Sequence, residues 1–170
     1  MNVYLIAGKA GSGKNYIAGL LNERLENSVV TGLAKYIKLF ALELTDWDGK
    51  DDDKPREFLQ TMGDTMRAVR DDFLTSRMIE DIKIYEKYGI ENVIVSDVRL
   101  KKELEYFKKS KFNIITIKVD SNYTRRVLTQ SEKDHQTEHD FENFNDFDYI
   151  ITNPFDGDVE EQLDEILKGR

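Results

Sequence analysis

Short apolar runs alternate along this chain with longer segments of mixed polarity. The apolar runs predict strands at residues 2–7, 28–31, 92–96, 113–119 and 147–152. The third run contains Val93-Ile94-Val95 without a polar interruption, which is typical of a strand that is covered on both faces of a parallel sheet.

Between these runs the apolar positions recur with helical spacing, which predicts helices at 13–26, 34–45, 55–88 (as two helices), 99–109, 122–130 and 158–168. In the second of these, one side is expected to carry Tyr36, Ile37, Phe40 and Leu44. Residues 131–146 are polar and acidic, with no core-forming run before Phe147. The alternation predicts an α/β fold with a parallel, doubly wound sheet, which binds its ligand at the carboxyl ends of the strands.

The composition narrows the class of protein. The chain has 170 residues, which suits a single domain, and 39% of them are hydrophobic, enough for a core. A net charge of −8 argues against polymeric nucleic acid as a partner, because such binding needs an excess of Lys and Arg. Without Cys there is no disulfide or thiolate zinc site, and without a membrane-length apolar run we expect a soluble, cytoplasmic protein. A homodimer is compatible with the sequence.

A glycine-rich segment follows the first strand directly. It reads Gly8-Lys9-Ala10-Gly11-Ser12-Gly13-Lys14-Asn15 and matches the Walker A spacing, except that Asn15 stands where Ser or Thr is usual. Glycines permit a backbone turn whose N–H groups converge on phosphate oxygens, and the following helix adds its positive end. Lys14 supplies a point charge for the transferred phosphate. The Asn15 oxygen is suited to bind Mg²⁺ or to hold a metal-bound water.

Asp97 and Arg99 come at the end of the strand at 92–96. A carboxylate there is suited to hold Mg²⁺, or to orient an acceptor group, since the phosphate loop lies at the same edge of the sheet. The alternative is that Asp97 caps a helix beginning near Arg99. The Arg99 guanidinium is suited to bind a phosphate; the alternative is an exposed pair with Glu103 one turn later.

Two further groups of cations are candidates for the chemistry. Arg125 and Arg126 are adjacent in an acidic chain and are expected either in a lid, at about 121–146, that neutralises the transferring phosphate, or on an ordinary helix surface. The helical segment between the second and third strands carries Arg56, Gln60, Arg67 and Arg70. Gln60 and Arg67 share a helix face, which suits contact with a base or phosphate but equally a solvated surface.

His135 and His139 are four residues apart, beside several carboxylates. This spacing can place two metal ligands on one helix face, but the first His is not followed by Glu as it is in zinc peptidases. A structural or solvent-facing role is therefore expected for both.

Several segments together resemble the deoxynucleoside monophosphate kinases of phages and their bacterial relatives. The resemblance is carried by residues 8–18, 33–38, 56–63 with the following Arg67, Ser96-Asp-Val-Arg99, and 134–138. In that family an acidic residue often follows the lysine of the phosphate loop, so Asn15 is a smaller departure there than from the general Walker A pattern.

The resemblance implies an adenylate-kinase-like P-loop fold over 1–170, with a five-stranded parallel sheet, a helical acceptor-side insert at about 33–88 and a small lid. It implies transfer of the ATP γ-phosphate to a nucleoside monophosphate, with Mg²⁺ as cofactor. The roles implied for single residues are ATP binding by Gly8 to Asn15 and Tyr16, Mg²⁺ binding by Asn15 and Asp97, catalysis by Lys14, Asp97, Arg125 and Arg126, and acceptor binding by Lys35, Gln60, Arg67 and Arg99.

Other acceptors remain open, because kinases of phosphomevalonate and dephospho-CoA share this general plan. A nucleotide-binding regulatory module with little catalysis is a further alternative, and Asn15 is the observation that motivates it.

Overall fold

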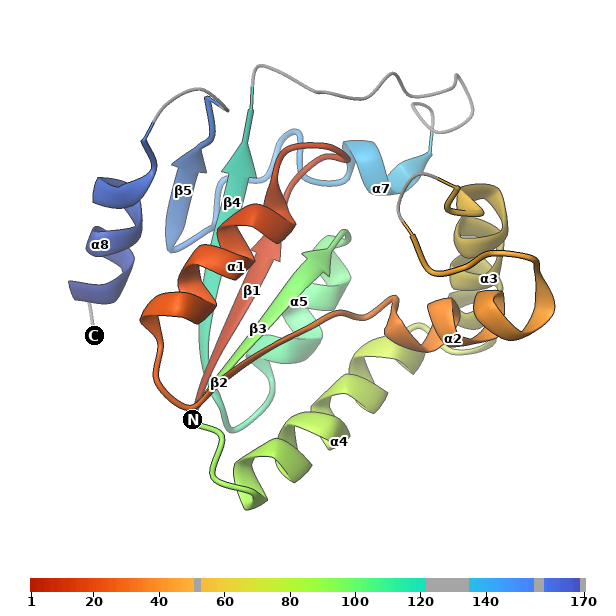
Figure 1. The fold of residues 1–170 in the computed structure, drawn as a ribbon, viewed down its shortest axis with the longest axis horizontal. Coiled ribbons are helices and arrows are strands. Elements are labelled where there is room, and N and C mark those ends of the chain that lie inside the picture. Colours follow the sequence, from red (N-terminus) through yellow and green to blue (C-terminus); the bar gives the residue numbers. More distant parts are fainter. Residues whose placement is uncertain (51–52, 122–134, 155–157, 169–170) are drawn as a thin grey trace.

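A parallel sheet forms the centre of the molecule (Figure 1). The computed structural model describes residues 1–50, 53–121, 135–154 and 158–168. The strands are β1 (Asn2–Ala7), β2 (Ser28–Thr31), β3 (Asn92–Val98), β4 (Asn113–Asp120) and β5 (Tyr149–Thr152). They form a five-stranded parallel sheet in the order β2-β3-β1-β4-β5, so β1 is central and its carboxyl end feeds the glycine-rich loop. The prediction of a parallel α/β sheet is confirmed.

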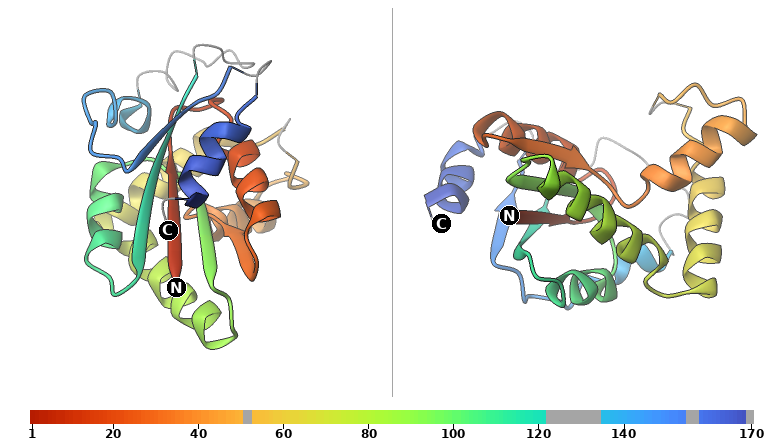
Figure 2. Two further views of the ribbon diagram at one scale, coloured as in Figure 1. Left: turned by 90° about the vertical axis from the view of Figure 1, so that its left-hand side faces the viewer. Right: turned by 90° about the horizontal axis from the view of Figure 1, so that it is seen from below.

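Helices cover both faces of this sheet (Figure 2, left). Those described are α1 (Lys14–Arg24), α2 (Lys35–Leu44), α3 (Arg56–Val69), α4 (Phe73–Lys87), α5 (Lys101–Lys108), α7 (Gln136–His139) and α8 (Glu160–Lys168). α1 and α8 lie on one face, and α4 and α5 on the other, while α2 and α3 project beyond the β2 edge (Figures 1 and 2). None of the helices in the described ranges is long and apolar enough to cross a membrane.

Successive side chains of β1 point to opposite faces of the sheet, and the core is therefore divided into two layers. Val3 and Leu5 face the side covered by α4 and α5, whereas Tyr4 and Ile6 face α1 and α8, and all four side chains are fully buried. Each face of the sheet therefore has its own apolar layer, which holds the central strand rigidly below the loop that follows it.

Some predicted boundaries are wrong in ways that affect the site. The third strand continues to Val98, so Asp97 lies inside β3, and the helix expected from 99 begins at Lys101. The last strand begins at Tyr149 and not at Phe147. The helix predicted at 122–130 lies outside the described residues.

The predicted side of α2 is only partly buried, and one expectation about the core is wrong. Only Ile37 and Ala41 of α2 are buried, and Phe40 and Leu44 are 48% and 68% exposed, because this helix lies past the edge of the sheet. The segment before Phe147 does contribute to the core, since Phe141 is 7% exposed and packs edge-on against Phe147 at 5.4 Å between ring centroids. The apolar pattern did not predict this burial, because three Phe residues that are separated in the sequence form the cluster without a continuous apolar run.

Candidate active site

Three glycines shape the loop between β1 and α1. Gly8, Gly11 and Gly13 have φ values of 148°, 78° and 94°, a region that L side chains rarely adopt. α1 begins at Lys14, immediately after Gly13, so the loop lies at the positive end of that helix. N–H groups arranged in this way bind the oxygens of a phosphate.

The first of these glycines has no room for a side chain. A Cβ atom on Gly8 would lie 2.4 Å from the carbonyl oxygen of Val119 in β4. Because that neighbour is backbone in a central strand, it cannot move aside cheaply. The start of the loop is therefore fixed against the sheet.

The Lys14 side chain is folded back over the loop. Its Nζ donates hydrogen bonds to the carbonyl oxygens of Gly8, at 2.7 Å, and Lys9, at 2.6 Å, and the residue is 7% exposed. The ammonium group is therefore already held where the loop turns. Of the other residues predicted to bind ATP, Lys9 and Asn15 are exposed, Ala10 is half-buried and Tyr16 is 58% exposed.

Sequence reasoning missed Asn153, which supports the loop from the other side. This residue follows β5 and is 1% exposed, and its Nδ2 donates to the carbonyl oxygen of Ser12 at 3.0 Å. Its own backbone N–H bonds the Asp120 carbonyl at 2.8 Å, which ties it to the end of β4. A polar residue at the carboxyl end of the last strand was the available signal.

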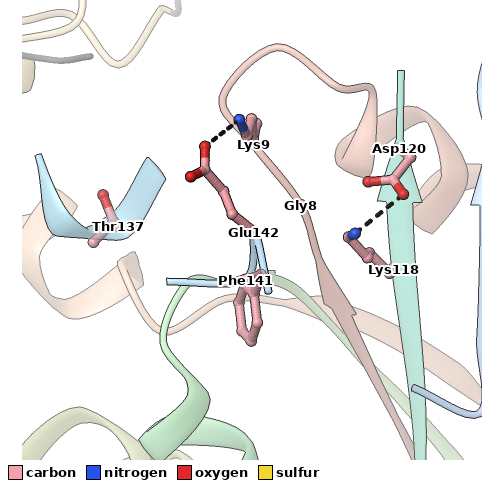
Figure 3. A pocket seen from close by; sticks show the side chains of 7 residues that line it. All are labelled: Gly8, Lys9, Lys118, Asp120, Thr137, Phe141 and Glu142. Atoms are coloured by element: carbon pink, nitrogen blue, oxygen red, sulfur yellow. Dashed lines mark hydrogen bonds and ion pairs between the residues drawn. The ribbon is translucent and has the colours of Figure 1, made fainter. Parts of the chain in front are cut away.

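A small cavity of about 40 Å³ lies beside the loop (Figure 3). Its lining comprises Gly8, Lys9, Lys118, Asp120, Thr137, Phe141 and Glu142. Glu142 Oε1 accepts from Lys9 Nζ at 2.7 Å and lies 3.1 Å from His139 Nδ1. The hydrogen bond from Lys9, and then that from His139, lower the pKa of Glu142. These contacts attach the segment after α7 to the phosphate loop.

Asp97 holds the loop that leads into α2. Its Oδ1 accepts the N–H of Leu33 at 2.7 Å, and its Oδ2 accepts the N–H of Ala34 at 3.0 Å. The carboxylate fills the space beside Gly32, where a Cβ atom would lie 2.6 Å from Oδ2. The expected alternative, a cap on a helix near Arg99, is therefore wrong: Asp97 binds the two residues that precede α2, which the sequence does not place next to it. Asp97 connects the strand beside the phosphate loop to the first helix of the insert.

Arg67 of α3 and Glu103 of α5 form a pair with little exposure. Arg67 Nη2 lies 2.9 Å from Glu103 Oε1, and the two side chains are 15% and 3% exposed. Glu103 Oε2 accepts the backbone N–H of Arg99 at 2.8 Å. The alternative was that the Arg99 side chain pairs with Glu103. That alternative is wrong, because Glu103 binds the backbone N–H of Arg99 and the guanidinium of Arg67.

A second, larger hollow of about 250 Å³ opens beside Arg67 and is called the α3–α7 hollow. It is lined by Asp64, Arg67, Ala68, Asp71, Leu100, Lys102, His135 and Thr137. Thr137 also lines the cavity beside the phosphate loop, so the turn of α7 lies between the two spaces. Cations and carboxylates are both present, and Lys102 Nζ pairs with Asp71 at 3.1 Å.

His135 links this hollow to α3. Its Nε2 lies 2.9 Å from Asp64 Oδ2, and its Nδ1 lies 2.9 Å from Thr137 Oγ1. Within the described ranges, no three His, Cys, Asp or Glu side chains come together as a metal site. The role found for His135 is a structural one.

Lys35 belongs to a separate charged cluster. Its Nζ lies 2.5 Å from Asp81 Oδ2, which also accepts from the Tyr36 hydroxyl at 2.7 Å, and Arg77 pairs with Asp81 at 2.6 Å. Burial first, and then the hydrogen bond to Asp81, raise the pKa of Tyr36. Burial opposes ionisation of Asp81, but hydrogen bonds from Lys35 and Tyr36 and the nearby cations outweigh it, so the pKa of Asp81 is lowered. The cluster fastens α2 to α4.

The remaining predicted residues are placed as follows. Gln60 is half-buried in α3, seven residues before Arg67, and Arg56 begins that helix. Arg70 pairs with Asp72 at 2.8 Å. Arg125 and Arg126 lie outside the described residues, so their predicted role stays a prediction.

Comparison with solved structures identifies the fold. An APS kinase from Mycobacterium tuberculosis has a TM-score of 0.55 at 13% identity, over 98% of this chain and 94% of that one. A shikimate kinase from Aquifex aeolicus has a TM-score of 0.53 at 18% identity, over 99% and 95%, and one from Bacteroides thetaiotaomicron has 0.52 at 12%, over 98% and 96%. The architecture is the adenylate-kinase-like fold of P-loop kinases, as predicted.

Comparison of the sequence with models of protein families identifies the family of this chain. The model of the phosphomevalonate kinase family matches residues 6–113, which include the phosphate loop, the helical insert and Asp97. The chain belongs to this family, and it is an ATP-dependent phosphotransferase. No curated protein sequence matches it.

Proposed function

We propose that the chain transfers the γ-phosphate of ATP to a nucleoside monophosphate, with a deoxynucleotide as the preferred class, and that the acceptor binds in the α3–α7 hollow. The observation that carries the proposal is the mixed charge of that hollow. Arg67 and Lys102 suit a phosphate, while Asp64 and Asp71 suit a group with hydrogen-bond donors. A nucleotide offers both, through its phosphate and the amino or imino groups of its base.

The second candidate for the acceptor is phosphomevalonate, which family membership favours. This acceptor has a carboxylate as well as a phosphate, so it would bring negative charge toward Asp64 and Asp71. Like charges at short range disfavour binding unless extra cations offset them. We therefore rank it below a nucleotide.

The donor residues act on ATP through position and charge. The N–H groups of Gly11 and Gly13 would bind the β-phosphate, and Lys14 would exchange its carbonyl partners for β- and γ-oxygens. The acceptor phosphate attacks in line, so no protein nucleophile is required.

Asn15 and Asp97 are the proposed Mg²⁺ ligands. Both offer oxygen, the donor that Mg²⁺ prefers, and Asp97 sits where β3 ends beside β1. Each Asp97 oxygen accepts one N–H from the loop before α2, and a carboxylate oxygen has a further lone pair for a metal-bound water. Bound Mg²⁺ supplies neutralisation of the phosphate charge. Arg125 and Arg126 are proposed to neutralise the transferring group, and Lys35, Gln60 and Arg99 to support the acceptor.

The experiment is a panel of acceptors with ATP and Mg²⁺, using the four deoxynucleoside monophosphates, the ribonucleotides, phosphomevalonate and dephospho-CoA. Deoxyribose 5-phosphate is the matched control, because it keeps the phosphate and lacks the base. We expect at least one nucleotide to exceed phosphomevalonate in kcat/KM by about 10²-fold, and deoxyribose 5-phosphate to be poor. Transfer to phosphomevalonate alone would establish the second candidate. Tight ATP binding without transfer to any acceptor would favour a regulatory module.

A further inference from the structure

Glu103 is a carboxylate with almost no exposure that divides its two oxygens between different parts of the molecule. Oε2 accepts the N–H groups of Arg99, at 2.8 Å, and Leu100, at 3.1 Å, at the start of α5. Oε1 accepts the Arg67 guanidinium, which comes from α3, at 2.9 Å. A buried carboxylate is costly unless it is paired, and here each oxygen has a definite partner.

Gly63 lies one helical turn before Arg67 and close to Nη1, the guanidinium nitrogen that does not contact Glu103 Oε1. A Cβ atom at Gly63 would lie 3.0 Å from Arg67 Nη1 and 3.5 Å from Ile37 Cδ1. Glycine is unfavourable inside a helix compared with Ala, so propensity does not explain it in α3. A methyl group at this position would require the guanidinium to shift by a few tenths of an ångström.

We propose that Glu103 and Gly63 are positioning residues that hold the Arg67 guanidinium in one orientation at the α3–α7 hollow; the inference rests on the acceptor role of Arg67 proposed above. Arg67 is 15% exposed and lines that hollow, so the part left open is available to an acceptor phosphate. A guanidinium that is already fixed loses less conformational freedom when it binds an anion in bidentate fashion.

The substitution Glu103→Gln separates this role from helix capping. The amide oxygen of Gln can still accept the N–H groups of Arg99 and Leu100, but its NH₂ group would face the guanidinium, donor against donor. We expect the KM of the acceptor to rise about tenfold while the KM of ATP changes less than twofold. The assay varies each of the four deoxynucleoside monophosphates in turn at fixed ATP.

The substitution Gly63→Ala shifts Arg67 through its Nη1, while Glu103 itself is unchanged. Ala favours the helix, so we expect the melting temperature to stay or rise while the acceptor KM rises by several-fold. Gly19→Ala in α1 is the matched control, because a Cβ atom there has no neighbour within 4 Å. It should leave both KM values unchanged.

Arg67→Ala distinguishes the failure of this inference from the failure of the proposed function. If Arg67→Ala leaves the acceptor KM unchanged, the acceptor role of Arg67 is wrong. If Arg67→Ala raises it and Gly63→Ala and Glu103→Gln do not, the positioning role is wrong and the proposed function stands. In the Arg67→Ala background Glu103→Gln should add less than twofold, and multiplied effects would overturn the inference. Should Glu103→Gln fail to fold, Gly63→Ala decides alone.

Discussion

The phosphate loop and the α3–α7 hollow are built on opposite principles. The loop uses consecutive residues and backbone groups, with glycine conformations next to a helix N-terminus. The hollow uses side chains from α3, α5 and α7, which meet only after the chain has folded. The proposed recognition of a phosphate by the loop would therefore be local and general, whereas the proposed choice of acceptor would depend on tertiary packing.

The two regions also treat charge differently. In the loop, Lys14 is held by backbone carbonyls. In the hollow, Arg67, Lys102 and His135 each lie against a carboxylate. An anion that enters the hollow must therefore compete with internal acceptors, and this selects for ligands that offer more than charge.

The largest effect should come from the loop. Lys14→Ala removes the cation proposed to stabilise the transferring phosphate, so we expect kcat to fall by at least about 10³-fold, or about 4 kcal/mol. The measurement is phosphate transfer from ATP, with circular dichroism to verify the fold. The exposed Lys87 of α4 is the control, and Lys87→Ala should keep full activity. A fully active Lys14→Ala variant would refute the assignment of the donor site.

A smaller effect is expected where the loop depends on a distant side chain. Asn153→Ala leaves the Ser12 carbonyl without its amide donor, so the ATP KM should rise about tenfold, with about 1–2 kcal/mol lost from the free energy of unfolding. The acceptor KM should not change.

Asn92→Ala is the matched control for Asn153→Ala. Asn92 is also buried, at 5% exposure, and its Nδ2 donates to the Glu26 carbonyl at 2.8 Å, but at the amino end of the sheet. It should lose similar stability and keep the ATP KM. Equal KM effects in both variants would show that general destabilisation, and not loop support, is responsible.

The smallest effect concerns the fastening of the insert. Asp81→Asn removes the carboxylate shared by Lys35, Tyr36 and Arg77, and because two of these partners are partly exposed we expect a loss of only about 1–2 kcal/mol in unfolding free energy. Since the folded-state pKa of Asp81 is lowered from 3.8, its contribution is complete above the unfolded pKa and is lost as the pH falls through the folded one.

Chemical denaturation between pH 3 and pH 7 measures this dependence. The difference between the wild type and Asp81→Asn should be constant at pH 5–7 and should shrink only below about pH 4. Asp48→Asn removes an exposed carboxylate that pairs with Lys50, and its effect should be smaller. A difference as large at pH 3 as at pH 7 would mean that the charge of Asp81 is not what fastens α2 to α4.

The contrast between the two regions also explains what the sequence predicts well. Residues 8–15 are contiguous, and their glycines restrict the backbone directly, so the loop and its helix are visible in the motif. The strands at 2–7 and 28–31 match β1 and β2 because short apolar runs report burial in the sheet.

The periodicity of the sequence does not predict which residues from distant segments come into contact. Glu103 was considered only as a neighbour of Arg99, because nothing local shows that Arg67, from another helix, reaches it. The contact of Asp97 with Leu33 spans 64 positions and was likewise invisible. Helical spacing shows that Phe40 shares a face with Ile37, but not whether any element lies opposite that face, and Phe40 is 48% exposed.

Thr137 lines both spaces, so a single turn of helix separates the proposed ATP side from the proposed acceptor side. Glu142 attaches this region to Lys9, and His135 attaches it to Asp64. If ATP binding shifts this turn and changes acceptor affinity by some factor, thermodynamic linkage requires the acceptor to change ATP affinity by the same factor. The two substrates would then bind cooperatively, through one shared wall and without direct contact between their distal parts.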